Sequence, residues 1–347
     1  MSTGLPEAWP RLLGDVGGSN ARFALETAPG VIEDILALSN DRYPTLEDAL
    51  RDYLAQVGAR RVAHAAIGIA NPLNGDKVVM TNCHWRFSIE ATRRALDLTT
   101  LLLLNDFTAL ALALPRLPRG ELSKIGGGEP RLDSPLALIG PGTGLGVSAL
   151  VPHAGGWRAL SGEGGHTSFA PADEREIGVW RYVSARFGHV SHERLLSGSG
   201  LSLLYRALCA LDSAAELDLA PSEVSARGLS GADARCRETL EIFCGLLGSA
   251  AGNLALTLGA RGGVYIGGGI VPRLSGFFEQ SPFRRRFEDK GRMSAYLADI
   301  PVYLITSAYP ALPGVAAHLA DHLAPRDPAP VDTTTHPRGG TAGDMHA

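Results

Sequence analysis

Lysine is nearly absent from this chain of 347 residues and occurs only at Lys77, Lys124 and Lys290. None of the three lies in a GxxxxGK[ST] segment, which excludes a Walker A phosphate-binding loop. The net charge is −4, and the one dense basic run, at 284–286, is followed by the acidic residues Glu288 and Asp289. A nucleic-acid partner is not expected, because such binding needs a basic surface. Any phosphate held by this chain is therefore expected to be held mostly by backbone groups.

Cysteine is also scarce, with four residues that share no CxxC spacing. This pattern argues against zinc and disulfide frameworks and is typical of free thiols in a reducing compartment. The first ten residues contain Glu7 and two prolines where a signal peptide would have an apolar run. We therefore expect a cytoplasmic protein.

Residues 242–260 carry no charge and have the length of a membrane span. The segment also contains Gly245, Ser249, Gly252 and other small residues, which suit the close packing of a helix against a neighbouring element. We expect a buried core helix here and no membrane partner.

Glycine, in contrast, is abundant: 42 of 347 residues, about 12%, against about 7% on average. The hydrophobic share of 45% and the charged share of 20% are those of a folded soluble protein. Because single cores stop growing at about 250–300 residues, a chain of this length predicts two domains.

Strand and helix patterns alternate along the chain, which predicts an α/β fold. In the first part we expect strand, turn and strand over 11–26, a helix over 43–58, strands over 61–70, 77–80 and 101–104, and a helix that begins at Ser88. Residues 115–135, rich in Pro and Gly, are expected to connect two domains. The second part predicts strands over 136–139, 146–151, 264–266 and 301–305, and helices over 200–211, 238–258 and 314–323. The tail after Pro325 is expected to be disordered.

Two glycine loops have the same layout. Leu13-Gly-Asp-Val-Gly-Gly and Ile139-Gly-Pro-Gly-Thr-Gly each follow an apolar strand, and Gly14 and Gly140 are 126 positions apart. This repetition suggests two related halves that face each other. Glycines in a hairpin are most often turn residues, but two matching loops together with the run at 267–269 favour a nucleotide site, in which backbone N–H groups hold the phosphates.

The spacing of these loops argues against a dinucleotide-binding fold. That fold needs GxGxxG between a strand and a helix, whereas both loops here are followed by strands. Asp15 lies within the first loop and would repel phosphate unless a cation lies between them. We therefore expect a complex of Mg²⁺ with a nucleotide.

Asn105 and Asp106 directly follow the apolar strand at 101–104. In α/β sheets ligands bind beyond the carboxyl ends of the strands, so a carboxylate at this position can act as a general base. Asn and Asp are also favoured helix N-caps, and the two interpretations have about equal weight for the pair.

Ser161-Gly-Glu-Gly-Gly-His places Glu163 and His166 in a glycine-rich loop, where their side chains can meet a polyhydroxylated ligand. The glycines argue against the helical ExxH of a di-iron protein, and His189-Val-Ser-His-Glu is not the HExxH of a zinc protease. No resident metal site is expected. Taken alone, either histidine is more often a surface or core residue than a ligand.

Taken together, these motifs resemble the bacterial glucokinase family of the proteobacterial type, within the actin, Hsp70 and sugar kinase superfamily. The resemblance covers residues 11–323, nearly the whole chain. It rests on LLGDVGGSNARFAL from Leu12, TNCHWRFSI from Thr81, LLNDFTALA from Leu103, GPGTGLG from Gly140, SGEGGH from Ser161, GHVSHERLLSGSGL from Gly188 and VYIGGGIVPRL from Val264.

The resemblance implies two actin-like (ribonuclease H-like) α/β domains with a ligand cleft between them. The smaller domain would comprise 1–115 plus about 302–325, and the larger domain would comprise 116–301. Residues 326–347 would form the tail. ATP with Mg²⁺ would be the phosphate donor and glucose the acceptor, and the family suggests a homodimer.

The resemblance also implies roles for individual residues. Asp106 would be the catalytic base that takes the proton of the glucose 6-hydroxyl. Sugar hydroxyls would be bound by Asn105, Glu163, His166 and Glu193. ATP would be bound by Gly14, Asp15, Val16, Gly17, Gly18, Ser19, Thr143, Gly144, Gly267, Gly268 and Gly269.

Departures from the family pattern are small. Ser19 stands where the family usually has Thr, and it keeps the hydroxyl. The cysteine-rich zinc motif of the related repressor, open reading frame and kinase family is absent, which favours the glucokinase branch. Three alternatives stay open: a kinase for another hexose such as fructose, mannose or an amino sugar; a silent sugar-binding protein; and a sugar-sensing regulator, although ten residues before the first strand cannot form a helix-turn-helix.

Overall fold

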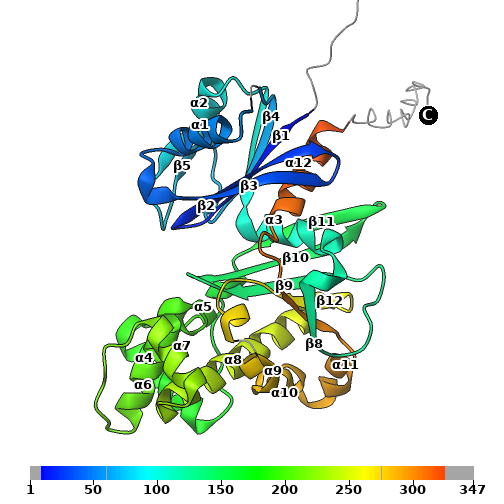
Figure 1. Cartoon of the computed structure of the whole chain (residues 1–347). Helices are drawn as coiled ribbons and strands as arrows, with labels where there is room; N and C mark the ends of the chain where they lie inside the picture. The colour runs from blue at the N-terminus through cyan, green and yellow to red at the C-terminus, as the bar shows by residue number, and fades with distance from the viewer. Residues whose placement is uncertain (1–8, 60, 275, 325–347) are drawn as a thin grey trace, which may run out of the picture.

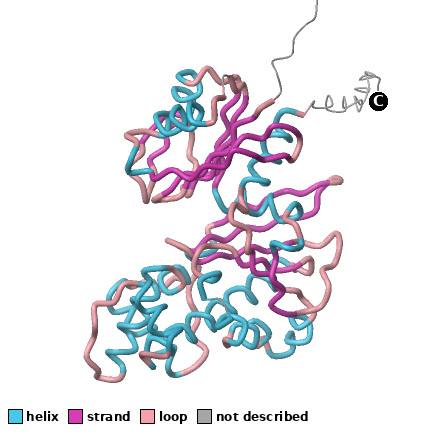
Figure 2. Tube along the Cα trace, in the orientation of Figure 1, coloured by secondary structure: helices cyan, strands magenta, loops and turns pink. Residues whose placement is uncertain are grey.

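Two α/β domains make up the molecule, one above the other in the view of Figure 1. The computed structural model describes residues 9–59, 61–274 and 276–324. Figure 2 shows that each domain has a sheet at its centre, with helices packed on the sheet. The predicted fold class, two actin-like α/β domains, is confirmed.

The first domain is built on a five-stranded sheet of order β3-β2-β1-β4-β7. β1, β2 and β3 are antiparallel, whereas β1, β4 and β7 are parallel. The strands are β1 (Arg11–Val16), β2 (Asn20–Ala28), β3 (Val31–Ser39), β4 (His64–Ile69) and β7 (Thr100–Asn105). The smaller elements are the hairpin β5 (Lys77–Val79) and β6 (Arg86–Ser88) and the helices α1 (Leu46–Gln56) and α2 (Ile89–Ala95). Ser88 caps α2, as its sequence position predicts, and its hydroxyl accepts the N–H of Ala91.

The second domain repeats this plan in a six-stranded sheet of order β11-β10-β9-β12-β13-β8. β9, β10 and β11 are antiparallel, and β9, β12 and β13 are parallel. The strands are β8 (Leu122–Gly126), β9 (Leu136–Pro141), β10 (Leu145–His153), β11 (Gly156–Gly162), β12 (Gly263–Ile266) and β13 (Val302–Ile305). Gly14 lies in β1 and Gly140 lies in β9, which take the same place in the order of the two sheets. The two related halves expected from the paired loops are therefore present.

Two strands differ from the sequence expectation. β8 lies inside the segment 115–135, which was expected to be a connection. It adds to the sheet edge beside β13 with only two apolar side chains, Leu122 and Ile125, too few to stand out from the Pro and Gly around them. β13 was assigned to the smaller domain by the division at about residue 302, yet it pairs with β12 in the larger one. The chain returns to the first domain only after this strand.

Helices cover the second sheet and extend away from it. They are α4 (Glu174–Phe187), α5 (His192–Leu195), α6 (Gly198–Leu211), α7 (Pro221–Ser230), α8 (Ala234–Leu258), α9 (Gly276–Gln280), α10 (Phe283–Glu288) and α11 (Ser294–Ala298). Among the described helices, α8 alone is long and apolar enough to cross a membrane, with a mean hydropathy of 1.4. Because 67% of the apolar stretch of α8 is buried inside the protein, α8 is a core helix, as its small residues predict.

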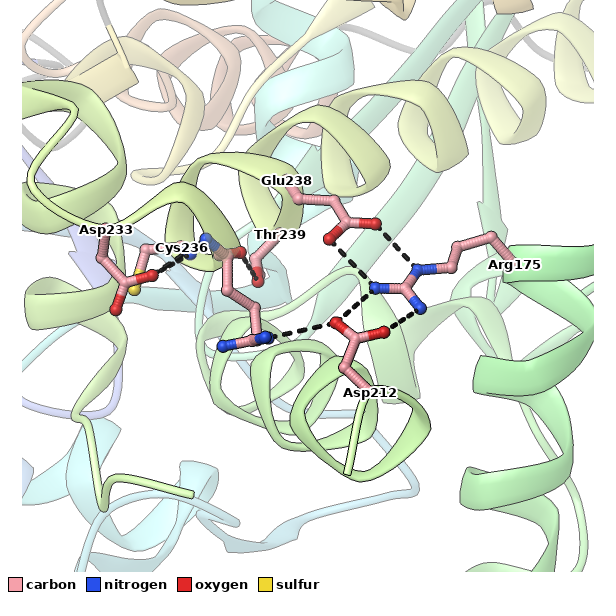
Figure 3. Close-up of polar contacts among 7 residues, drawn as sticks. Arg175, Asp212, Asp233, Cys236, Glu238 and Thr239 are labelled. Atoms are coloured by element: carbon pink, nitrogen blue, oxygen red, sulfur yellow. Dashed lines mark hydrogen bonds and ion pairs between the residues drawn. The ribbon is translucent and has the colours of Figure 1, made fainter. Parts of the chain in front are cut away.

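A cluster of charges joins three of these helices (Figure 3). Arg175 on α4 donates to both carboxylate oxygens of Asp212, at 2.6 and 2.9 Å, and to both of Glu238 on α8, at 2.8 and 3.1 Å. The hydrogen bonds from Arg175 hold the pKa of Asp212 down at about 2. Asp233 caps α8 by accepting the N–H groups of Arg235 and Cys236. These contacts fix the helical part of the second domain relative to α8.

The two domains meet where α3 (Asp106–Ala113) crosses α12 (Leu312–Leu323). α12 packs on α3 and on β1 and β4 of the first sheet. The crossing is so close that a Cβ on Gly314 would overlap the carbonyl oxygen of Ala109 and lie 2.7 Å from the N of Ala113. Chain connections on both sides of this crossing run between the domains: 114–121 after α3, which contains the short 3₁₀ helices η2 (Leu114–Arg116) and η3 (Arg119–Glu121), and 306–311 before α12.

We expect Gly314→Ala to lower the free energy of unfolding by about 1–3 kcal/mol, because the added methyl group forces the two helices apart. Urea denaturation followed by circular dichroism measures this change. Gly120→Ala is the matched control, since a Cβ at Gly120 meets nothing within 4 Å, and its effect should stay within about 0.5 kcal/mol. Equal stability of the two variants would contradict the close crossing.

Candidate active site

Asp106 lies at the carboxyl end of β7, where the chain enters α3. Asn105 is the N-cap of α3, and its side-chain oxygen accepts the N–H groups of Phe107 at 3.0 Å and Thr108 at 3.1 Å. Its amide nitrogen donates to Oδ1 of Asp106 at 3.0 Å, and the N–H of Phe107 donates to the same oxygen at 2.9 Å. The N-cap interpretation is therefore confirmed for Asn105, whereas Asp106 lies beside the cap with its carboxyl group hydrogen-bonded, and its role as a base stays a prediction.

The surroundings of Asp106 make its carboxyl group hard to ionise. Burial raises its pKa from 3.8 to about 7, and the nearby charges of Asp15 and Glu163 act in the same direction. The N–H of Phe107 partly opposes this rise. A carboxyl group with a pKa near neutrality can both accept and release a proton under ordinary conditions, which is what a general base or acid needs.

Asp15 lines the same cavity as Asp106, and both residues belong to the first domain. It lies on β1 opposite Arg22 on β2, and Nη1 of Arg22 is 3.5 Å from Oδ2 of Asp15. Burial raises the pKa of Asp15 even though Arg22 acts to lower it. Two carboxyl groups with raised pKa values thus lie on β1 and directly after β7 of the same sheet and line one cavity, an arrangement typical of a site that binds a cation or moves a proton.

A cavity of about 350 Å³ brings these groups together. Asp15 and Asp106 line it, and so do the glycines 267–269, which follow β12 as the sequence predicted. The cavity is also lined by two arginines that sequence reasoning missed, Arg22 and Arg273, and by residues 305–308. Arg273 follows the glycine run by four residues, and that spacing was the available signal. Two guanidinium groups beside two carboxylates can accommodate both phosphate groups and a bound cation.

The first glycine loop is held by a buried amide that sequence reasoning also missed. Asn40, fully buried, donates from Nδ2 to the carbonyl oxygens of Gly17 at 2.9 Å and Gly18 at 3.0 Å. The turn is closed by the N–H of Gly17, which donates to the carbonyl of Asn20 at 3.0 Å. Because Asn40 holds the carbonyls, the loop has a fixed shape before any ligand arrives.

Other residues assigned to ATP lie deeper in the sheet. A Cβ on Gly14 would lie 2.9 Å from Cγ2 of Ile67, so packing between strands already explains this glycine. Val16 is fully buried, and its side chain belongs to the core of the first domain. Ser19, in contrast, is exposed at the turn. Contact of Gly14 and Val16 with a nucleotide stays a prediction that would involve the backbone.

The second glycine loop closes a tight turn between β9 and β10. The N–H of Gly142 donates to the carbonyl of Gly144 at 2.8 Å, and Thr143 is exposed at the tip. A Cβ on Gly144 would overlap Oε2 of Glu193, which accepts the N–H of Leu145 at 2.9 Å. Thr143 and Gly144 do not line the 350 Å³ cavity, so their contact with phosphate stays a prediction.

The base of the same hairpin packs on the residue after Asp106. A Cβ on Gly146 would overlap the ring of Phe107, and one on Gly140 would lie 2.8 Å from Cζ of that ring. The two glycines therefore make room for Phe107 between β9 and β10. The second loop and Asp106 are thus parts of one packed unit.

Three of the predicted sugar ligands, Glu163, His166 and Glu193, lie close to one another, and Glu163 is near enough to Asp106 to influence its pKa. His166, in the 3₁₀ helix η4 (Gly164–His166), lies 4.0 Å from Glu163 and 3.8 Å from Glu193 through its two ring nitrogens. The hydroxyls of Thr108 on α3 and Ser161 on β11 are 3.0 Å apart, which brings the segment before Glu163 to the start of α3. The side chains of Glu163 and His166 are more than half exposed, so they can accept a ligand from solvent.

Within the described ranges, no cluster of three or more His, Cys, Asp or Glu could hold a metal ion. Mg²⁺ in phosphoryl-transfer sites typically keeps several waters and is held by one or two carboxylates together with the phosphates of the substrate. Asp15 and Asp106 are such carboxylates, and they fit an ion that arrives with its nucleotide.

Two related α/β domains that place buried carboxylates in the cavity where they meet define a class, the actin-like two-domain kinases. The family model described as glucokinase matches residues 12–322. The chain belongs to the glucokinase family.

Its relatives agree with this membership. It is 91% identical over its whole length to the glucokinase of Chromobacterium violaceum, and 58% identical to that of Neisseria meningitidis over 91% of this chain and 96% of the relative. A crystal structure of glucokinase from an Antarctic psychrotroph is 37% identical and superposes with a TM-score of 0.82, covering 90% of this chain and 99% of the other.

Asp106→Asn should stabilise the protein at high pH. The folded-state pKa of about 7 lies above the ordinary 3.8, so the stability that the protonated carboxyl provides is present below about pH 4 and is lost as the pH rises through 7. The amide removes this loss, and its gain in unfolding free energy should be larger at pH 8 than at pH 5 by about 2.7 kcal/mol.

Urea denaturation at the two pH values measures this gain. Asp97→Asn, at an exposed position, is the control and should give the same small effect at both. A gain for Asp106→Asn that does not depend on pH would contradict the raised pKa.

Proposed function

We propose that this protein transfers the γ-phosphoryl group of ATP to the 6-hydroxyl of glucose, giving glucose 6-phosphate and ADP, with Asp106 as the general base. The observation that carries the proposal is the position of Asp106, whose carboxyl group has a pKa of about 7 and faces the cavity shared with Asp15 and the glycines 267–269. The relatives named glucokinase support glucose as the acceptor.

The chemistry follows from the groups that line the cavity. The 6-hydroxyl oxygen of the sugar attacks the γ-phosphorus in line, its proton passes to the Asp106 carboxylate, and the bond between the γ-phosphorus and the bridging oxygen breaks to release ADP. Arg22 and Arg273 supply positive charge to the phosphates as negative charge shifts toward the leaving group. Mg²⁺, when bound with the nucleotide, supplies further neutralisation of the phosphate charge.

The nucleotide would be held mainly by backbone N–H groups of the two glycine loops. The fixed shape that Asn40 gives the first loop supports this role, because preorganised donors cost little to arrange when the phosphate arrives. The glycines 267–269 would lie near the adenosine. The full ATP set is proposed to be Gly14, Asp15, Val16, Gly17, Gly18, Ser19, Thr143, Gly144, Gly267, Gly268 and Gly269.

Glucose would be bound by Asn105, Glu163, His166 and Glu193. The closeness of His166 to Glu163 and Glu193, and of Asn105 and Glu163 to Asp106, supports the assignment, because carboxylate, amide and imidazole groups pair well with sugar hydroxyls. One carboxylate oxygen of Glu193 accepts the N–H of Leu145. This hydrogen bond fixes the orientation of the Glu193 side chain and leaves the other oxygen for a sugar hydroxyl.

The proposal also includes a cytoplasmic location, a requirement for Mg²⁺ and a homodimer. The free thiols of Cys83, Cys209, Cys236 and Cys244 support a reducing compartment. The cavity between the domains supports closure over the two substrates, which would keep water from acting as acceptor.

Asp106→Asn should lower kcat for glucose phosphorylation by about 10²–10⁴-fold, because the base is lost while the shape of the side chain is kept. A coupled assay with MgATP and a panel of hexoses on the purified protein measures this, and glucose should give the highest kcat/KM. Asp97→Asn, far from the cavity, should match the unchanged protein. Undiminished turnover of Asp106→Asn would rule out Asp106 as the base, and better turnover of fructose or mannose would rule out glucose as the preferred substrate.

A further inference from the structure

A second and larger cavity, of about 760 Å³, lies where both chain connections run between the domains. We call it the hinge cavity. Arg116 and Glu121 line it from the first connection, and Ser307, Ala308 and Tyr309 line it from the second. Small-molecule sites in proteins have volumes of about 300–1,000 Å³, so the hinge cavity is large enough for a ligand of its own.

One buried carboxylate points to the kind of ligand. Glu26 on β2 is only 3% exposed and lines the hinge cavity. Its Oε1 accepts the N–H of Gly30 at 3.0 Å, but its Oε2 has no hydrogen-bond partner among the described residues. Nη1 of Arg11 lies 3.7 Å from Oε2, within ion-pair range but too far for a hydrogen bond. A buried acceptor left without a donor is costly, and a ligand that supplies the donor removes that cost.

The walls around this carboxylate are mostly apolar. Ile32 and Ile35 of β3 form one wall, and the face of α12 that carries Leu312, Ala316 and Ala320 forms the other. Three carboxylates line the cavity, those of Glu26, Glu121 and Asp321, against two guanidinium groups, those of Arg11 and Arg116. Apolar walls with an excess of negative charge fit a molecule that has an apolar body and a cationic head.

We propose that the hinge cavity binds a small amphipathic amine, whose ammonium group donates to Oε2 of Glu26 and whose apolar part lies between β3 and α12. A ligand in the hinge cavity also affects the 350 Å³ cavity that Asp15 and Asp106 line, because Ser307 and Ala308 line both cavities. A molecule held between the two connections favours the domain arrangement in which the cavity fits it and so changes the affinity for the nucleotide. This second step rests on the proposed function, whereas binding of the amine does not.

The test uses 2-phenylethylammonium as the probe and isothermal titration calorimetry on the full chain without substrates. We expect saturable binding of one probe per chain, and no binding of 3-phenylpropionate, which has a similar body with an anionic head. Glu26→Gln should weaken probe binding at least tenfold. Ala320→Phe, which adds a ring to the α12 wall of the cavity, should abolish it.

Glu33→Gln is the matched control, because Glu33 is an exposed carboxylate on the neighbouring strand β3 and does not line the cavity. It should bind the probe as the unchanged protein does. Absence of saturable binding, equal binding by Ala320→Phe, or equal binding of the anionic compound would overturn the proposal.

The coupling is measured separately, as the dissociation constant of a non-hydrolysable ATP analogue with and without saturating probe. A change of about fivefold or more is expected, and probe affinity should change by the same factor when the analogue is saturating. Probe binding with an unchanged analogue affinity would overturn the coupling and leave the binding site standing. Failure of the phosphorylation assay would leave the calorimetric result intact, so the two proposals fail independently.

Discussion

The ring of Phe107 fixes the position on which the rest of the site depends. It fills the space that Gly140 and Gly146 leave open in the second sheet, while the residue before it, Asp106, directly follows β7 of the first sheet. Asp106 is therefore held by both domains at the place where they meet. A side chain larger than hydrogen at either glycine would displace the ring and with it the carboxylate, so the sequence Asn-Asp-Phe and the second glycine loop act as one structural unit.

This placement also accounts for the electrostatics of the cavity. Burial and the neighbouring carboxylate of Asp15 raise the pKa of Asp106 to about 7, so that the group is poised between its two protonation states near neutral pH. Asp15 approaches Asp106 from β1 of the same sheet, whereas Glu163 acts on Asp106 from the second domain. The pKa near neutrality thus comes first from the burial of Asp106 in a cavity that both domains line, and it is what makes this aspartate suitable as a base.

Local sequence patterns predicted those helices and strands whose formation depends on apolar runs and capping residues within the segment itself. The strands that end at Val16 and Asn105, the cap of α2 and the buried helix α8 follow from apolar runs and capping residues, and the motif order correctly identified the family. The assignment of β13 to the smaller domain failed, because nothing in four apolar residues tells which of two similar sheets they join. β8 was missed because edge strands need few apolar side chains.

The site was only partly predictable for a similar reason. Asp15, Asp106 and the glycines 267–269 were expected to lie together and do line one cavity. Arg273 and Asn40 were missed because they act between segments far apart in the chain, as in the hydrogen bonds from Asn40 to the loop at 17–18. Arg22 was missed because its position opposite Asp15 depends on the register in which β1 and β2 pair. The roles assigned to Thr143 and Gly144 depend on how far the two domains close over a nucleotide. No local sequence pattern encodes the extent of that closure.

The most direct test of the central claim is a crystal structure of the protein with glucose and a non-hydrolysable analogue of MgATP. The account predicts that the 6-hydroxyl oxygen of glucose lies within about 2.6–3.2 Å of the Asp106 carboxylate, with the phosphates of the analogue against both glycine loops. A sugar bound with its 6-hydroxyl out of reach of Asp106, or a nucleotide bound away from the cavity that Asp15 and Asp106 share, would contradict it.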